Sequence, residues 1–169
     1  MKILVRGVVG LLAVGVCGVA AALLFIDSGI YDVTAMTPHT RLVAWAVHQT
    51  YQHAMARDSA GITAPADLET AANVQAGAHL YLETCAMCHG APGMPPGPLR
   101  RGINPSAPFL LAATRKNQPN QMFWVIKNGV KMTGMAAFGK SMTDQQIWDL
   151  AAFLQKGRGI SAADYAKLN

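Results

Sequence analysis

The stretch Cys85-Ala86-Met87-Cys88-His89 decides how this sequence is interpreted. Two cysteines separated by two residues, with a histidine directly after the second, have the spacing that attaches c-type haem. Each thiol adds across one vinyl group of the porphyrin, and the histidine beneath the ring plane can give its imidazole to the iron. The motif therefore predicts one covalently bound haem c, held by Cys85 and Cys88 and ligated by His89.

A C-x-x-C pair can also form half of a zinc site or a thioredoxin-like redox pair. A structural zinc site needs four ligands, and the one remaining cysteine, Cys17, lies in an apolar run. A redox pair would lie in alternating strands and helices, and the sequence contains no convincing strand. Haem attachment is the interpretation that fits best.

An apolar run over residues 7–26 follows Lys2 and Arg6, with no charge before Asp27. Twenty helical residues span about 30 Å, the thickness of the hydrocarbon core of a bilayer. The alternative is a cleaved signal peptide with its site near Ala20-Ala21-Ala22. Because the run continues beyond those alanines, we expect an uncleaved signal-anchor.

The end of a membrane span that carries positively charged residues usually lies in the cytoplasm. Residues 1–6 are therefore predicted to be cytoplasmic, and residues 7–26 to cross the bacterial inner membrane once. Everything after them is then predicted to lie in the periplasm, the compartment in which bacteria attach haem to C-x-x-C-H motifs.

The net charge is modest and does not indicate nucleic-acid binding. The formal charge is +5, and subtracting Lys2 and Arg6 leaves +3 beyond the apolar run. No aromatic and basic patch accompanies it. Three lysines, Lys127, Lys131 and Lys140, fall near one loop, where they form either a solvated face or a docking face for an acidic redox partner.

Residues 27–65 are predicted to connect the anchor to a soluble domain, with a helix over about 40–57. This helix is only loosely amphipathic, which suits a juxtamembrane helix on the membrane or against a neighbouring subunit. Its histidines, His48 and His53, are interpreted as surface residues because no second haem motif is present.

The haem domain is predicted over residues 66–169. A helix begins near Glu69, with Thr70 or Asp67 as its N-cap, and runs into the motif. Further helices are expected over about 120–127 and after the capping box Thr143-Asp144-Gln145-Gln146, ending at Gly157.

Glycine and proline dominate the segment from Gly90 to Pro108. Such a long irregular loop in a small domain is usually functional. We expect it to wrap the proximal side of the haem, with a backbone carbonyl accepting the proton of the second ring nitrogen of His89.

Several of these segments together resemble a class I (mitochondrial-type) cytochrome c domain from about Gly77 to Leu154. The resemblance rests on the following elements: Gly77, Tyr81, the motif with Gly90, Gly97-Pro98-Leu99, Asn128-Gly129, Thr133-Gly134-Met135 and Ile147-Trp148-Asp149-Leu150. It implies an all-α fold of short helices around one haem, here preceded by the membrane helix and the juxtamembrane helix. It also implies contacts of Gly77 and Tyr81 with Trp148 and its neighbours.

The resemblance further implies that the Pro98 carbonyl braces His89, with Pro95 and Pro96 as alternatives. It implies a methionine as the sixth ligand, from the loop before the last long helix. Met135 matches the family's Gly-Met-Pro-Ala-Phe segment, except that alanine replaces the proline, and Met132 is the alternative. Trp124 and Arg115 are expected to pack against the haem ring or to pair with one of its propionates.

Histidine and methionine ligation would leave no open position on the iron, so the expected chemistry is one-electron transfer rather than catalysis. The leading hypothesis is a membrane-tethered monohaem cytochrome c of a periplasmic respiratory chain. Its donor would be a dehydrogenase or quinol-oxidising complex and its acceptor a terminal oxidase or another cytochrome. The alternatives are a permanent haem subunit of a membrane oxidoreductase, in contact through about 40–57, and a haem sensor or enzyme with an open iron site.

Overall fold

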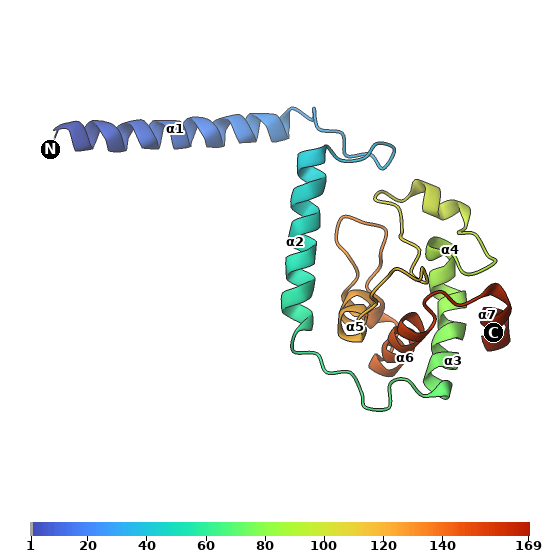
Figure 1. Ribbon diagram of the computed structural model, residues 1–169. Helices are drawn as coiled ribbons and strands as arrows, with labels where there is room; N and C mark the ends of the chain where they lie inside the picture. Colours follow the sequence, from blue (N-terminus) through green and yellow to red (C-terminus); the bar gives the residue numbers. More distant parts are fainter. Residues whose placement is uncertain (1) are drawn as a thin grey trace. The chain divides into compact units, whose positions relative to one another are not determined.

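The computed structural model describes residues 2–169, and these fold into helices and loops (Figure 1). The α-helices are α1 (Lys2–Asp27), α2 (Arg41–Ser59), α3 (Ala71–Leu80), α4 (Ala86–His89), α5 (Pro119–Asn128), α6 (Asp144–Lys156) and α7 (Ala162–Leu168). A π-helical turn, η1 (Tyr81–Cys85), and two 3₁₀ turns, η2 (Pro98–Gly102) and η3 (Phe138–Lys140), complete the order. The described residues form no strand beyond an isolated bridge between Ala91 and Met94, which confirms the predicted all-α class.

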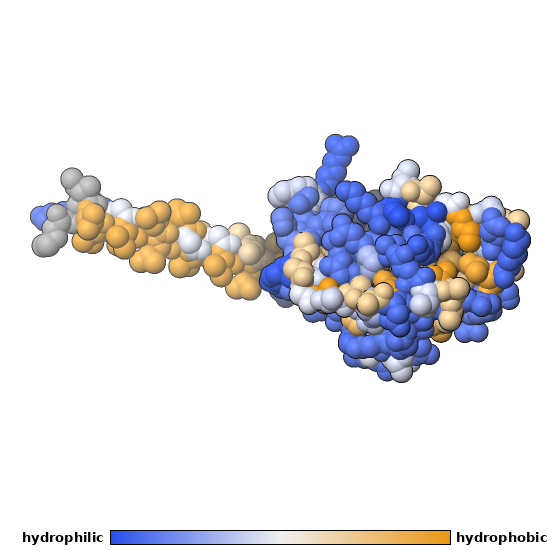
Figure 2. Space-filling model, turned by 60° about the horizontal axis from the view of Figure 1, so that its bottom comes forward, coloured by the Kyte–Doolittle hydropathy of each residue, from blue (hydrophilic) through white to orange (hydrophobic). Residues whose placement is uncertain are grey.

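The chain divides into two compact units, one up to Thr37 and one over Pro38–Asn169. The first unit contains α1, whose segment Leu4–Asp27 is long and apolar enough to cross a membrane. Figure 2 shows a largely hydrophobic surface along this helix, whereas the visible face of the other unit is mostly hydrophilic. The helix therefore has the length and composition predicted for residues 7–26.

Helix α2 confirms the helix expected over 40–57 and belongs to the second unit. The helix packs on α5 near its C-terminal end, where Met55 and Ser59 are buried and the Asn120 side-chain amide donates to the Ser59 carbonyl at 3.0 Å. Its N-terminal half is different, because Leu42 and Trp45 are 73% and 60% exposed. Helix α2 is thus fixed to the domain mainly through its C-terminal half.

The core of the second unit is the crossing of α3 and α6 (Figure 1). At the crossing a Cβ on Gly77 would lie 2.0 Å from the Asp149 carbonyl oxygen, so only glycine allows the two backbones to approach this closely. One turn further along, the Tyr81 ring packs on the Phe153 ring with centroids 5.4 Å apart. The contact predicted for Gly77 and Tyr81 is therefore made by Asp149 and Phe153.

Asp149, a neighbour of Trp148, thus makes the contact that the resemblance implied, whereas the Trp148 ring packs on another helix. This ring stacks on Phe123 of α5, with centroids 4.1 Å apart and an interplanar angle of 21°. Trp148 therefore joins α6 to α5, whereas Phe153 is fully buried and packs against α3. The reason is helical phase, since residues four positions after Asp149 share its face and Trp148 does not.

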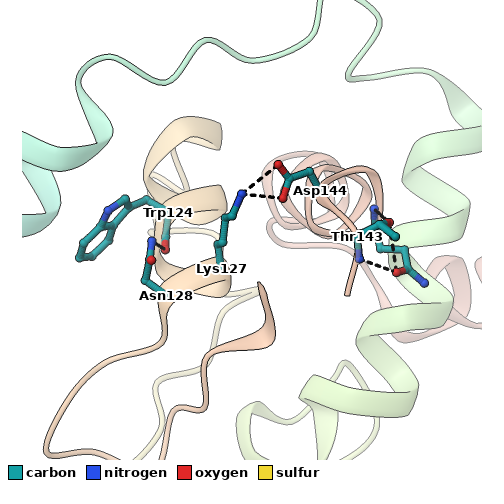
Figure 3. Close-up of polar contacts among 6 residues, drawn as sticks. Trp124, Lys127, Asn128, Thr143 and Asp144 are labelled. Atoms are coloured by element: carbon teal, nitrogen blue, oxygen red, sulfur yellow. Dashed lines mark hydrogen bonds and ion pairs between the residues drawn. The ribbon is translucent and has the colours of Figure 1, made fainter. Parts of the chain in front are cut away.

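Polar contacts at the start of α6 fix it beside α5 (Figure 3). Thr143 and Gln146 form the predicted capping box, with each side chain bonded to the other's backbone N–H. The Lys127 ammonium contacts both Asp144 carboxylate oxygens, at 2.7 and 2.9 Å. Both side chains are substantially exposed, so this ion pair contributes little to stability and mainly orients the two helices.

Candidate haem-binding site

The two cysteines and the histidine lie at the end of one nearly continuous helical path, α3–η1–α4. Thr70 starts this path by accepting a hydrogen bond from the Asn73 backbone N–H, which selects Thr70 over Asp67 as the N-cap. The π-helical turn η1 widens the helix just before the motif, and π-turns often mark functional positions. The Thr84 hydroxyl of this turn donates to the carbonyl of Leu80, the last residue of α3, at 2.5 Å.

Both cysteines of the motif are free thiols and form no disulfide. Cys85 is buried, and this burial raises the pKa of its thiol. Cys88 is half-buried. Two unpaired sulfurs one helical turn apart are what covalent attachment to two vinyl groups requires.

His89 is almost fully buried, with 9% of its surface exposed, and its ring is held from one side. Its Nδ1 atom lies 2.7 Å from the Pro108 carbonyl oxygen, so Nδ1 carries a proton and donates it. Burial lowers the pKa of His89, although the Pro108 carbonyl acts in the opposite direction. The lowered pKa favours the neutral imidazole, and the hydrogen bond at Nδ1 leaves Nε2 to bind a metal.

The carbonyl that braces His89 confirms the expectation that the long loop provides one, but the prediction of Pro98 is wrong. Pro98 instead begins η2, and the preceding Gly97 backbone N–H donates to the Met87 carbonyl at 2.9 Å. The Gly-Pro element thus packs on α4 without bracing the histidine. The loop continues beyond η2, and the carbonyl of its last residue, Pro108, accepts the hydrogen bond from His89.

The loop after α5 contains both candidate methionines, and they differ in their surroundings. Met132 has a left-handed backbone, with φ of 59°, and is 63% exposed. Met135 is half-buried, and its backbone N–H donates to the Thr133 hydroxyl at 3.0 Å while its carbonyl accepts from Val130. The loop is therefore built around the backbone of Met135.

This methionine loop also contacts the loop on the histidine side. A Cβ on Gly134 would lie 2.9 Å from a side-chain carbon of Ile103, so the two loops meet at that point. The loop that carries Met135 is consequently in contact with the loop that carries Pro108.

The other two predicted haem neighbours, Trp124 and Arg115, both belong to the second unit. The Trp124 side chain is half-buried and projects from α5 on the side away from Asp144 (Figure 3). Its role at the haem stays a prediction. Arg115 donates to the Asn117 side-chain oxygen at 3.0 Å, and its charge is near enough to lower the pKa of His89.

Sequence reasoning missed two parts of the site's support. Asn117 is buried, and its amide donates to the Leu110 and Leu154 carbonyls at 2.8 and 2.7 Å, which ties the segment after Pro108 to α6. Helix α7 was also missed, although Ser161 caps it through the Asp164 N–H. A serine three residues before an acidic residue is a recognisable helix start.

The donor set fits a covalently bound haem. The described residues bring together two free thiols, an imidazole with one nitrogen already bonded, and a half-buried thioether on a loop in contact with the histidine-side loop. No group of three or more histidine, cysteine, aspartate or glutamate residues that could hold a metal ion occurs among residues 2–169. Each element suits a role in the expected haem attachment and ligation.

Comparison with known proteins also indicates a haem-binding domain. Residues 72–154 match the family described as cytochrome C oxidase, cbb3-type, subunit III. The chain is also 33% identical over 84 residues to a quinohemoprotein alcohol dehydrogenase of Comamonas testosteroni. That match covers 50% of this chain and 11% of the relative, so the chain spans a small part of that protein's length. No solved structure gave a significant match.

The matched residues begin in α3 and end in α6, so they include the close crossing at Gly77, the haem motif, the braced histidine and the methionine loop. Domains of this family bind haem c covalently and transfer electrons. The protein therefore carries a class I c-type cytochrome domain.

Proposed function

We propose that this protein is a membrane-tethered monohaem cytochrome c that relays single electrons in a periplasmic respiratory chain. One C-x-x-C-H motif supports a single haem. The length and exposed apolar surface of α1 support a single-pass anchor in a bacterial inner membrane. The positive residues Lys2 and Arg6 support an orientation with the haem domain in the periplasm.

The proposed axial ligands are His89 and Met135. A haem with these ligands exchanges one electron reversibly, and a methionine sulfur raises its reduction potential relative to a second histidine. His89 is presented with Nδ1 already occupied by Pro108, which fixes the ring orientation. Met135 is preferred over Met132 because its backbone is anchored and its side chain is half-buried.

The observation that carries this function is the buried, braced His89 together with a loop built around Met135. Two protein ligands leave no coordination site for a substrate, so the residues support electron transfer rather than catalysis at iron. The test is the optical spectrum of the ferric protein. The weak far-red band of an iron–methionine bond should be present in the wild type, absent in Met135→Ala and retained in Met132→Ala. Loss in Met132→Ala alone would refute the assignment.

We also propose that the redox partner presents an acidic surface. Lys131 and Lys140 are exposed on the segment that carries Met135, whereas Lys127 is engaged with Asp144. Electrostatic steering of this kind weakens as salt increases. The rate of reduction by a periplasmic dehydrogenase or a quinol-oxidising complex should fall with ionic strength, and charge reversal at Lys131 should flatten that dependence. A rate independent of salt would contradict the proposal.

A second candidate is a permanent haem subunit of a membrane oxidoreductase. The outward face of α2 favours it, since Leu42 and Trp45 are exposed about one turn apart on the N-terminal half of the helix. The matching family's description as an oxidase subunit, and the relative's as a dehydrogenase, also suit this role. Purification in mild detergent should then yield a stoichiometric partner, lost in Trp45→Glu and retained in His53→Glu. Isolation of the wild type alone favours the independent carrier.

A further inference from the structure

The Pro108 carbonyl that braces His89 is flanked by two residues held by the same side chain, Arg100. The Arg100 Nε–H donates to the Ala107 carbonyl at 2.9 Å. The guanidinium carbon of Arg100 lies 4.3 Å from the centroid of the Phe109 ring. Arg100 therefore holds the residues immediately before and after Pro108.

The segment that carries Arg100 is itself fixed to the helix of the haem motif. Arg100 belongs to η2 (Pro98–Gly102), and the Gly97 N–H that precedes η2 donates to the Met87 carbonyl at 2.9 Å. A Cβ on Gly97 would lie only 3.2 Å from the same carbonyl oxygen, so the two backbones are in close contact. Movement of η2 relative to α4 is thereby restricted.

The Phe109 ring contacts both Arg100 and the backbone next to His89. A Cβ on Gly90, the residue after His89, would lie 3.2 Å from the Phe109 Cε1 atom. The ring is thus held between Gly90 and the Arg100 guanidinium although it remains half exposed. Arg100 is therefore linked to α4 through η2, and Phe109 links Arg100 to Gly90, the residue after His89.

We propose that Arg100 is a positioning residue for the axial histidine: it holds Ala107–Phe109 so that the Pro108 carbonyl keeps its hydrogen bond to His89 Nδ1. This inference rests on the proposed ligation of iron by His89. A hydrogen bond at the second nitrogen makes the imidazole a stronger ligand, which stabilises the ferric state. Loosening the hydrogen bond consequently raises the reduction potential.

Lysine cannot replace arginine in this role. Its ammonium carries the same charge but lacks the planar group that stacks on Phe109 and the Nε–H directed at Ala107. Arg100→Lys therefore removes the positioning contacts while the local charge stays constant. Arg101→Lys is the matched control, because Arg101 is the exposed neighbour in the same 3₁₀ turn.

The test uses the full-length holoprotein in detergent. In the reduced state, NMR should show that the His89 Nδ1 proton exchanges about tenfold faster in Arg100→Lys than in the wild type, the effect of weakening one hydrogen bond. The midpoint potential of this variant should rise. Arg101→Lys should match the wild type in both measurements.

A second variant tests the same proposal through a different residue. Phe109→Leu should also accelerate Nδ1 exchange, and the double variant should exchange no faster than either single variant, because both changes release the same segment. Additive effects, or equal exchange in Arg100→Lys and Arg101→Lys, would overturn the inference. A wild type without a histidine-ligated haem c would instead refute the proposed function, and this inference with it.

Discussion

Substitution of Gly77 by alanine tests the helix crossing on which the site depends. The added Cβ would lie 2.0 Å from the Asp149 carbonyl oxygen, 2.5 Å from its carbonyl carbon and 2.8 Å from the Phe153 Cβ. Two of these three atoms are backbone, so no side-chain rotation relieves the clash. Helices α3 and α6 must therefore move apart by about 1 Å to restore a contact of 3.0 Å, below which Cβ atoms are essentially never found.

The expected cost follows from two opposing effects. Alanine gains about 1 kcal/mol of helix propensity over glycine. A gap of about 1 Å along the crossing forfeits up to half of the dispersion energy of each facing atom pair, and overpacked cores commonly lose about 1–3 kcal/mol or more. We expect a net loss of about 3 kcal/mol in the free energy of unfolding, measured by denaturant titration of the detergent-solubilised holoprotein with circular dichroism.

The control is Gly102→Ala, because a Cβ at that position meets nothing within 4 Å. Its unfolding free energy should stay within about 0.5 kcal/mol of the wild type. A Gly77→Ala protein as stable as this control would refute the reasoning, since it would mean that the two helices do not cross at backbone contact.

Three further substitutions test individual polar contacts, each by the same denaturant titration. Tyr81→Phe removes the 2.6 Å hydrogen bond from the phenol to the buried Gly90 carbonyl and should cost about 2 kcal/mol, whereas a neutral result would mean that water replaces the phenol. Asn117→Ala leaves the Leu110 and Leu154 carbonyls without a donor and should lower the free energy of unfolding by about 3 kcal/mol. A decrease below about 1 kcal/mol would contradict this. Thr143→Ala breaks the capping box and should cost about 1 kcal/mol, while Thr143→Ser should restore most of it.

Much of the fold could be predicted because the helix boundaries are encoded locally. Thr70 and the Thr143 capping box mark two helix starts by side-chain chemistry within three residues, and both are present in the structure. Gly77 indicated a close crossing because a glycine in a helix needs a packing reason. The choice between Trp148 and Phe153 as the partner of α3 depends instead on the helical phase of α6, which the family resemblance did not fix.

The site was predictable where chemistry is tied to spacing and not where it depends on the path of a loop. The cysteines and His89 occupy fixed positions in a motif, so they could be named from the sequence. The family resemblance implies Pro98 as the brace, but the loop folds through η2 before returning, and Pro108 supplies the carbonyl. Which of several prolines reaches His89 depends on tertiary contacts such as those of Arg100, which no local pattern encodes.

In the proposed haem site, protein groups occupy both axial positions of the iron, with Met135 as the second. Carbon monoxide binding to the reduced full-length protein tests this most directly. We expect the wild type to bind carbon monoxide poorly, because the methionine must first be displaced, and Met135→Ala to bind it readily while Met132→Ala behaves as the wild type. Rapid and complete binding by the wild type would contradict ligation by Met135 and would indicate an open iron site.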